Sequence, residues 1–145
     1  MTNRVLLVAE DDTIDAMLLE RAIAKCGVPI LMVHVENGDE AVQYLGGKGR
    51  YADRKQFPNP ELVLLDLKMP RLDGFGVLRW RLQNQQMRQP VVVFSSSALQ
   101  QDVAQAYALG ASSYVVKPAA PERLEQMVRA LNTWWTDFNV VCTSN

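Results

Sequence analysis

Acidic side chains stand directly after two of the short apolar runs in this sequence. Glu10, Asp11 and Asp12 are consecutive and follow the first run, and a second acidic position follows the third run at Asp66. Carboxylates that lie close together repel one another and need a cation between them. Because neither position includes a histidine or a cysteine, the oxygen ligands favour Mg²⁺ over zinc. We therefore expect a magnesium site wherever the fold brings the two positions together.

Two other apolar runs end in groups that phosphoryl transfer uses. Ser95 closes the fourth run and supplies a hydroxyl, but it begins a run of three serines, so the assignment is open by one position. Lys117 closes the fifth run and supplies a compact positive charge. Phosphoryl transfer needs a nucleophile and groups that neutralise the charge on the equatorial oxygens. This combination indicates Asp66 as a phosphoryl acceptor.

Hydrophobic patterning predicts the elements that must position these groups. Near-continuous apolar runs suit strands buried on both faces of a parallel sheet, and the segments between them have helical periodicity. The predicted strands are Val5–Ala9, Ile30–Val35, Leu62–Leu65, Val91–Phe94 and Tyr114–Val116. The predicted helices run from Ile14 to Lys25 with Gly27 as the stop, from Asp39 to Leu45, from Gly74 to Gln85, from Leu99 to Leu109, and from near Pro121 through Phe138.

Five strand–helix units in strict alternation predict an α/β fold of the flavodoxin-like, doubly wound (βα)5 type. This fold is a three-layer sandwich with a parallel sheet in the order 2-1-3-4-5. Ligands bind such sheets beyond the carboxyl ends of the strands, at the switch point between the first and third strands. Glu10, Asp11 and Asp66 are expected there, with Asp12 either as a helix cap or as an outer-sphere group of the site. The polar, turn-rich segment from Gly46 to Pro60 is predicted to be a surface loop.

Length and composition are typical of one soluble domain. The chain has 145 residues, of which 48% are hydrophobic and 21% charged, and its formal net charge is -1. We expect a domain over residues 1–138 and a partly ordered tail over residues 139–145. No basic run predicts DNA binding, and no stretch approaches the roughly 20 apolar residues of a membrane span. Cys26 and Cys142 lie far apart, which suggests reduced thiols in a cytoplasmic protein.

Four motifs, in their order and spacing, resemble the receiver domain of bacterial response regulators along nearly the whole chain. They are L-L-V-A-E-D-D from Leu6, L-L-D-L-K-M-P-R-L-D-G from Leu64, V-V-V-F-S-S-S from Val91, and G-A-S-S-Y-V-V-K-P from Gly110. The resemblance implies that Asp66 is the phosphorylated aspartate. It also implies that Glu10 and Asp11 are the acidic pair of the Mg²⁺ site, with Asp11 the more direct ligand. The backbone carbonyl of Lys68 completes the implied protein ligands.

The resemblance assigns further roles around the implied phosphoryl group. Ser95 matches the switch serine or threonine, because the spacing to Lys117 then needs no insertion, and Ser96 offers a backbone N–H to the phosphoryl group. Tyr114 matches the switch aromatic residue, and Lys117 matches the family's lysine. The bond between Lys117 and Pro118 is expected to be cis, an inexpensive geometry only before proline.

The implied function is that of a single-domain response regulator in a two-component system or phosphorelay. A histidine kinase or phosphotransfer protein would supply the phosphoryl group, and output would pass through a partner protein without direct DNA binding. The chain is most similar to the single-domain regulators paired with phytochrome-type kinases. It is not expected to be an enzyme beyond assisting its own phosphorylation and dephosphorylation.

Three alternative functions fit the sequence less well. An aspartyl phosphatase needs a second acid two residues after the nucleophile, where this chain has Lys68. A flavin- or nucleotide-binding module needs a glycine- or hydroxyl-rich loop where this chain has acidic residues. A docking module that has lost phosphorylation would not retain every reactive position.

Two further features are expected to have structural roles. His34, the only histidine, is expected to pack within the second strand. The aromatic end of the last helix, Trp134, Trp135 and Phe138, carries apolar residues on more than one face. It is expected either to belong to the core or to form a surface for homodimerisation or partner docking.

Overall fold

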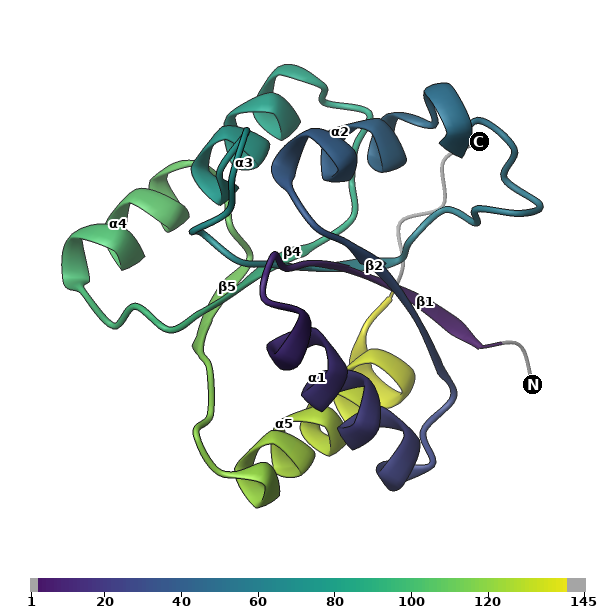
Figure 1. Ribbon diagram of the computed structural model, residues 1–145, viewed down its shortest axis with the longest axis vertical. Coiled ribbons are helices and arrows are strands. Elements are labelled where there is room, and N and C mark those ends of the chain that lie inside the picture. The colour runs from purple at the N-terminus through teal and green to yellow at the C-terminus, as the bar shows by residue number, and fades with distance from the viewer. Residues whose placement is uncertain (1–2, 141–145) are drawn as a thin grey trace.

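A five-stranded parallel sheet forms the centre of the protein (Figure 1). The computed structural model describes residues 3–140. The strands are β1 (Arg4–Ala9), β2 (Ile30–Val35), β3 (Leu62–Leu65), β4 (Val91–Ser95) and β5 (Ser113–Val116). Their order is β2-β1-β3-β4-β5, which confirms the predicted flavodoxin-like topology. The switch point lies between β1 and β3, which pair in parallel from Leu6 opposite Leu62 to Ala9 opposite Leu65.

Five helices cover the two faces of the sheet. They are α1 (Thr13–Cys26), α2 (Gly38–Gly46), α3 (Gly74–Gln83), α4 (Gln100–Ala108) and α5 (Pro121–Thr133). In Figure 1, α1 and α5 lie on one face, and α2, α3 and α4 lie on the other. Each face has its own buried apolar cluster, and the strands contribute to both clusters. This explains why the central strands are almost continuously apolar.

The sequence predicted most element boundaries to within one or two residues, because local chemistry sets them. Asp12 caps α1 as predicted, since its side chain accepts hydrogen bonds from the backbone N–H groups of Ile14 and Asp15. Gly27 ends the same helix with a left-handed φ of 63°. The exception is the C-terminal helix, whose α-helical part ends at Thr133 and continues as a π-helical turn from Trp134 to Phe138.

The segment predicted as a polar surface loop, residues 46–60, is packed against the end of α2. It contains a 3₁₀ turn, Gly49–Tyr51, and the ring of Tyr51 is buried beside the rings of Tyr44 and Phe57. The Arg54 guanidinium donates hydrogen bonds to the carbonyl oxygens of Tyr44, Leu45 and Phe57. Tyr51 and Phe57 therefore extend the apolar cluster on this face of the sheet, and the polar residues around them conceal this in the sequence.

The aromatic end of the chain divides between core and surface. Trp135 is 0% exposed, whereas Trp134 is 40% and Phe138 is 74% exposed. The Arg4 guanidinium lies 5.8 Å from the centre of the Trp135 ring. The predicted tail is described only at Asn139 and Val140, and residues 141–145, including Cys142, lie outside the described residues.

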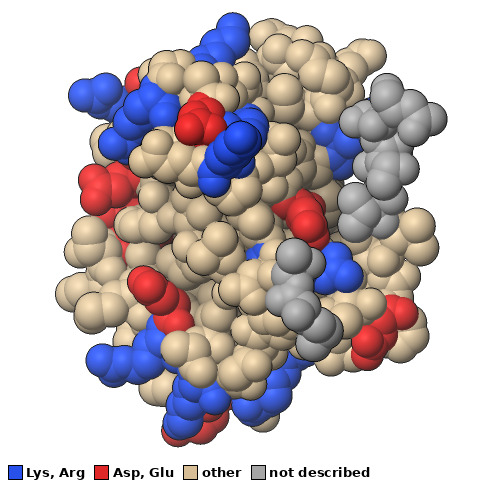
Figure 2. All heavy atoms as spheres, turned by 90° about the vertical axis from the view of Figure 1, so that its right-hand side faces the viewer, with Lys and Arg blue, Asp and Glu red and all other residues tan. Residues whose placement is uncertain are grey.

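Charges of both signs are interspersed over the face shown in Figure 2, around broad uncharged areas. This face therefore presents no extended field of a single sign. Within residues 3–140, none of the helices combines the length and apolar character needed to cross a membrane.

Candidate functional site

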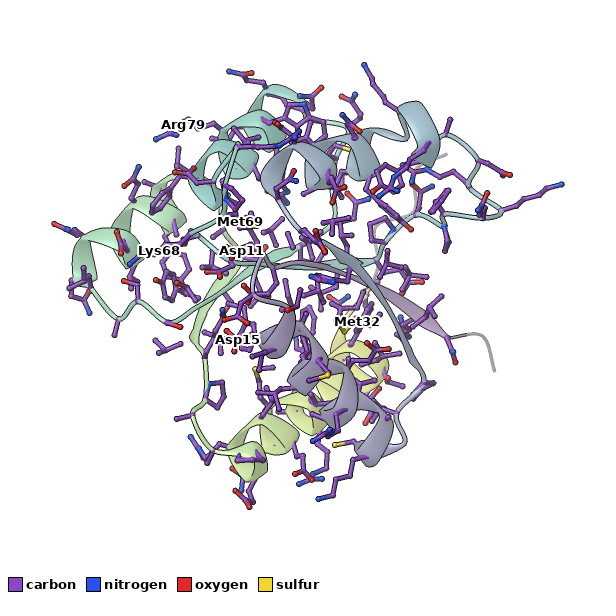
Figure 3. All side chains as sticks on the ribbon, in the orientation of Figure 1. Asp11, Asp15, Met32, Lys68, Met69 and Arg79 are labelled. Carbon is purple, nitrogen blue, oxygen red and sulfur yellow. The ribbon has the colours of Figure 1, made fainter. Side chains whose placement is uncertain are left out.

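The carboxyl ends of four strands bring the candidate residues to one edge of the sheet. The Asp66 N–H donates to the Ala9 carbonyl (3.0 Å), which places the end of β3 beside the end of β1. The Lys117 N–H donates to the Ser95 carbonyl (2.8 Å), which joins β5 to β4 in the same way. Asp11, Asp15 and Lys68 also lie at this end of the sheet (Figure 3).

The predicted acidic cluster is assembled in the structure. One carboxylate oxygen from each of Glu10, Asp11 and Asp66 lies within 4.8 Å of the other two. Glu10 and Asp66 are only 2% and 7% exposed, while Asp11 is exposed to solvent. The three side chains line a cavity of about 270 Å³. Three oxygen ligands that converge on one cavity, with one of them open to water, are a suitable donor set for Mg²⁺.

Lys117 is the main counter-charge within this cluster. Its Nζ lies 2.5 Å from a carboxylate oxygen of Glu10, 2.9 Å from Asp15 Oδ2 and 3.1 Å from Asp66 Oδ2. Burial lowers the pKa of Lys117, but hydrogen bonds to Glu10 and Asp15 and the charge of Asp66 outweigh burial and raise it above the ordinary value. The ammonium group therefore stays charged, and it lies close enough to Asp66 to form an ion pair with a negative group attached there.

Glu10 is a buried carboxyl group in a cluster that has more carboxylates than one lysine can balance. Burial, followed by the neighbouring Asp66 carboxylate, raises the pKa of Glu10 to about 7 even though Lys117 opposes the shift. Burial is the largest cause and disfavours the charged form of Glu10, and the neighbouring Asp66 adds to this effect. A divalent cation bound beside Glu10 would oppose both effects.

Asp15 is a member of the cluster that the sequence interpretation missed. It stands in the first turn of α1, and its carboxylate is the most exposed partner of Lys117, with 35% of the side chain accessible. The available signal was the predicted cap at Asp12, because a helix that begins directly after β1 has its first turn at the carboxyl edge of the sheet.

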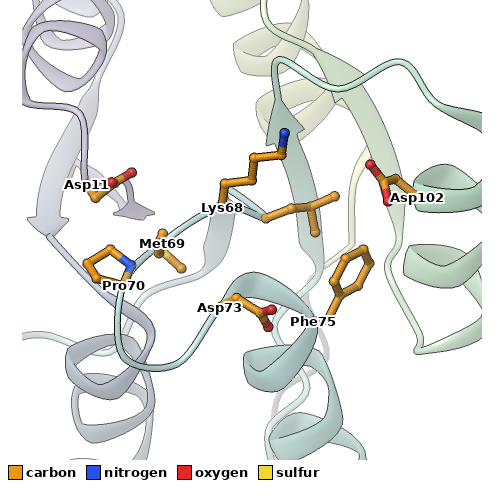
Figure 4. Close-up of a pocket in the computed structure, with 8 residues that line it drawn as sticks. Asp11, Lys68, Met69, Pro70, Asp73, Phe75 and Asp102 are labelled. Carbon is orange, nitrogen blue, oxygen red and sulfur yellow. The ribbon is translucent and has the colours of Figure 1, made fainter.

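The segment after Asp66 is held close to the site. The Lys68 N–H points toward Asp66 Oδ1 at 3.4 Å, and the Lys68 side chain is exposed. Gly74, the first residue of α3, donates its N–H to the Leu67 carbonyl (3.0 Å). Beyond this segment lies a second hollow, of about 530 Å³. Figure 4 shows Asp11 on one side of it, Asp102 of α4 on the other and Lys68 between them.

Ser95 and Tyr114 are linked through the loop between β4 and α4. Ser95 is 1% exposed, and its Oγ accepts the N–H of Ser97 at 3.2 Å. The Tyr114 hydroxyl donates to the Ser97 carbonyl at 2.8 Å, and the Ser97 hydroxyl donates to Asp102 Oδ2 at 2.6 Å. Ser96 is exposed at the mouth of the acidic cavity. One short loop therefore contacts both residues that the resemblance assigns to a switch.

The predicted cis bond before Pro118 is wrong. No peptide bond among residues 3–140 is cis, so the bond between Lys117 and Pro118 is trans. The trans form is the intrinsically favoured one even before proline, by about 0.5–1 kcal/mol. The Lys117 ammonium reaches all three carboxylates from a trans peptide.

His34 does more than pack within β2. Its Nε2 lies 2.6 Å from the backbone carbonyl oxygen of Glu10. No local pattern in the sequence predicts this contact, because it depends on how far β2 extends alongside the end of β1.

Comparisons with known proteins are consistent with this geometry. The response regulator receiver domain family matches residues 6–129. Response regulator Rcp1 of Synechocystis is 30% identical over 135 residues, which cover 92% of this chain and 90% of Rcp1. A solved form of Rcp1 bound to Mn²⁺ has a TM-score of 0.83 at 29% identity, and it covers 97% of this chain and 99% of that one.

Two further solved structures are similar over nearly their full lengths. RPA3017 of R. palustris, a response regulator in red light signalling, has a TM-score of 0.91 and 34% identity, covering 97% of this chain and 99% of its own. The phosphorylated cyanobacterial phytochrome response regulator RcpA has a TM-score of 0.86 and 32% identity, covering 98% and 100%.

Proposed function

Because the chain belongs to the response regulator receiver domain family of two-component signalling, we propose that it is a phosphorylation switch with Asp66 as the phosphoryl acceptor. The observation that carries this proposal is the position of the Asp66 carboxylate. It is buried at the switch point of the sheet, 3.1 Å from the Lys117 ammonium and within 4.8 Å of carboxylate oxygens of Glu10 and Asp11. The proposed receiver domain spans residues 1–138.

In the proposed reaction, a carboxylate oxygen of Asp66 attacks the phosphorus of a phosphohistidine on a kinase or phosphotransfer protein. The new O–P bond forms as the P–N bond breaks, and the electron pair of that bond stays on the imidazole of the donor. Mg²⁺ held by Glu10, Asp11, Asp66 and the Lys68 carbonyl would supply charge neutralisation during this transfer. Lys117 neutralises a further phosphoryl oxygen, and the exposed Ser96 N–H is a donor to the same group.

The proposed switch uses the loop that contacts Ser95 and Tyr114. A phosphoryl group on Asp66 attracts the Ser95 hydroxyl, which now accepts the Ser97 N–H. Moving Ser95 moves the loop whose Ser97 carbonyl holds the Tyr114 hydroxyl. The change on Asp66 therefore reaches the surface formed by α4 and β5, where an output protein would detect it.

The surroundings of Asp66 favour a switch over an enzyme that turns over external substrates. The residue two positions after Asp66 is Lys68, whose side chain is exposed. An aspartyl phosphatase would need a carboxylic acid at this position to protonate the leaving group. The chain is accordingly proposed to assist only its own phosphorylation and dephosphorylation.

A phytochrome-type histidine kinase is the proposed phosphoryl donor. The support is the similarity, over nearly the whole chain, to response regulators described in red light and phytochrome signalling. The test is transfer from a phosphorylated phytochrome-type kinase compared with a phosphorylated chemotaxis-type kinase. We expect a higher kcat/KM for the phytochrome-type kinase, and equal values for the two kinases would contradict this part of the proposal.

Self-association through the exposed aromatic end of the chain is proposed as a second property. Trp134 and Phe138 present apolar rings to solvent in the described chain. Sedimentation at increasing concentration is expected to show a dimer that Phe138→Ser weakens. A wild-type protein that remains monomeric at high concentration would exclude this property.

The phosphorylation itself is tested by incubation with Mg²⁺ and acetyl phosphate, followed by intact-mass measurement. One added phosphoryl group is expected, and it should be absent after EDTA treatment and in Asp66→Asn. An unmodified wild-type protein, or an unchanged adduct in Asp66→Asn, would refute the assignment of Asp66.

A further inference from the structure

Both polar backbone groups of Glu10 form hydrogen bonds to residues of β2. Its N–H donates to the Val35 carbonyl at 3.0 Å. Its carbonyl oxygen lies 2.6 Å from His34 Nε2. A carbonyl oxygen can only accept a hydrogen bond, so Nε2 of His34 carries the proton and donates it.

This side-chain bond occurs where the ladder between β1 and β2 stops. The last residues paired between these strands are Ala9 and Val35, and the chain then turns toward α2, which Asn37 caps. The Glu10 carbonyl has therefore passed the end of the regular pairing. The imidazole of His34 takes the place of the next backbone donor.

The peptide unit that His34 holds joins Glu10 to Asp11. Fixing the Glu10 carbonyl fixes the plane of that peptide unit, and the plane sets the direction in which the Asp11 side chain leaves the backbone. Glu10 and Asp11 are two of the three acids whose oxygens lie within 4.8 Å of one another. Such a cluster resists its own assembly, so a fixed backbone is needed to hold it together.

We propose that His34 is a positioning residue for the cation site, which orients Glu10 and Asp11 by donating its Nε2–H to the Glu10 carbonyl. The role rests on the proposed function, since it presumes that this acidic cluster binds Mg²⁺. His34 touches neither the cation nor the phosphoryl group in this role. Groups that orient metal ligands typically contribute 10–100-fold to metal affinity.

Three substitutions separate positioning from packing. His34→Gln keeps a donor for the Glu10 carbonyl, because the glutamine amide nitrogen and the imidazole Nε2 are the same number of bonds from Cα. His34→Leu removes the donor and keeps apolar bulk. Met32→Leu is the matched control. Met32 is on the same face of β2 and packs against the core beside α1 and α5, and its replacement by leucine conserves the side-chain volume.

The measurement is the Mg²⁺ dissociation constant by calorimetry, with MgCl₂ as the only titrant. We expect His34→Leu to weaken binding about 10-fold or more, and His34→Gln and Met32→Leu to stay within about threefold of the wild type. Unchanged binding in His34→Leu would overturn the inference, as would an equal loss in all three variants. If the wild-type protein binds no Mg²⁺, the proposed cation site and the inference both fail.

A measurement on the wild-type protein keeps the inference testable if His34→Leu does not fold. Nitrogen NMR of the imidazole should find His34 with its proton on Nε2, and should find a scalar coupling from Nε2 to the Glu10 carbonyl carbon across the hydrogen bond. A neutral imidazole protonated on Nδ1 would overturn the inference without affecting the phosphorylation of Asp66.

Discussion

Gly74 lies directly against the backbone of Asp66. A Cβ atom on Gly74 would stand 2.3 Å from the Asp66 carbonyl oxygen and 2.8 Å from the Leu67 Cα, both far inside contact distance. The N-terminus of α3 therefore touches the residue that follows β3 and leaves no room for a side chain. A displacement of the first turn of α3 would therefore displace the backbone of Asp66, the candidate phosphoryl acceptor.

Gly74→Ala should both destabilise the fold and impair the site. The added methyl group must push the Asp66–Leu67 segment away from α3, and such overpacking costs about 1–3 kcal/mol. Denaturant unfolding measures the loss of stability, and intact mass after acetyl phosphate treatment measures the loss of phosphorylation. Gly46→Ala is the control, because the nearest atom to its new Cβ is Lys48 Cγ at an ordinary 3.6 Å. Equal stability and equal phosphorylation in the two variants would contradict the close packing at Gly74.

Asp15→Asn should speed phosphorylation by an anionic small donor without disturbing the fold. Asp15 is the outermost acid around Lys117, so its removal lowers the negative charge that an incoming phosphate group meets. Lys117 keeps its ion pairs with Glu10 and Asp66. The rate with acetyl phosphate is expected to rise about two- to fivefold at low salt and to approach the wild-type rate at high salt.

Glu20→Gln is the matched control for this charge effect, because Glu20 is exposed on the same helix. It should leave the rate unchanged at every salt concentration. A slower Asp15→Asn would instead mean that Asp15 holds Lys117 in the position that phosphoryl transfer needs.

Tyr114→Phe should loosen the loop between β4 and α4. The substitution removes one half-buried hydrogen bond, from the Tyr114 hydroxyl to the Ser97 carbonyl, which is worth about 1 kcal/mol. Amide hydrogen exchange should become faster in residues 96–99, and phosphorylation of Asp66 should persist. Tyr107→Phe, on an exposed tyrosine of α4, should leave the loop protected. Unaltered exchange in Tyr114→Phe would argue against a link from Tyr114 to the loop.

Trp135→Ala and Phe138→Ala should have very different effects on stability. Trp135 is fully buried, so its truncation leaves a cavity that costs about 3–5 kcal/mol. Phe138 is 74% exposed, so its truncation should change the free energy of unfolding by about 0.5 kcal/mol or less. Chemical denaturation of the two variants checks this contrast, and similar losses would place both rings in the core.

Arg54→Met should unfold at a lower temperature than the wild type while phosphorylation remains normal. The guanidinium donates to carbonyl oxygens at the end of α2 and in the following loop, and hydrogen bonds from charged groups are worth about 1.5–3 kcal/mol. Lys55→Met, on an exposed neighbour, controls for the loss of charge. A normal melting temperature for Arg54→Met would mean that these hydrogen bonds do not stabilise the fold.

The sequence was sufficient for the strand order and for the groups that meet at the sheet edge. Near-continuous apolar runs identify buried parallel strands, and parallel strands place the residues after their carboxyl ends at one edge. This rule found Glu10, Asp11, Asp66 and Lys117, which follow the strand ends by one or two residues. It located the hydroxyl at the end of β4 only to within three serines, and the family resemblance favoured Ser95.

The features that the sequence did not predict depend on contacts between distant side chains or on small energy differences. Asp15 reaches Lys117 from a helix, and His34 reaches Glu10 from the middle of a strand, so neither follows the strand-end rule. Tyr51 is buried within a segment that is otherwise polar. The isomer before Pro118 is decided by about 1 kcal/mol, which no local pattern determines.

The ion pairs of Lys117 also constrain when the site can form during synthesis. They join Lys117, directly after β5, to Glu10 after β1, Asp15 in α1 and Asp66 after β3, which are all made much earlier. A nascent chain that has emerged only through β4 contains all of these acids but lacks their ammonium partner. Since chains emerge from the N-terminus, Asp66 must remain without this counter-ion until β5 leaves the ribosome and docks at the edge of the sheet.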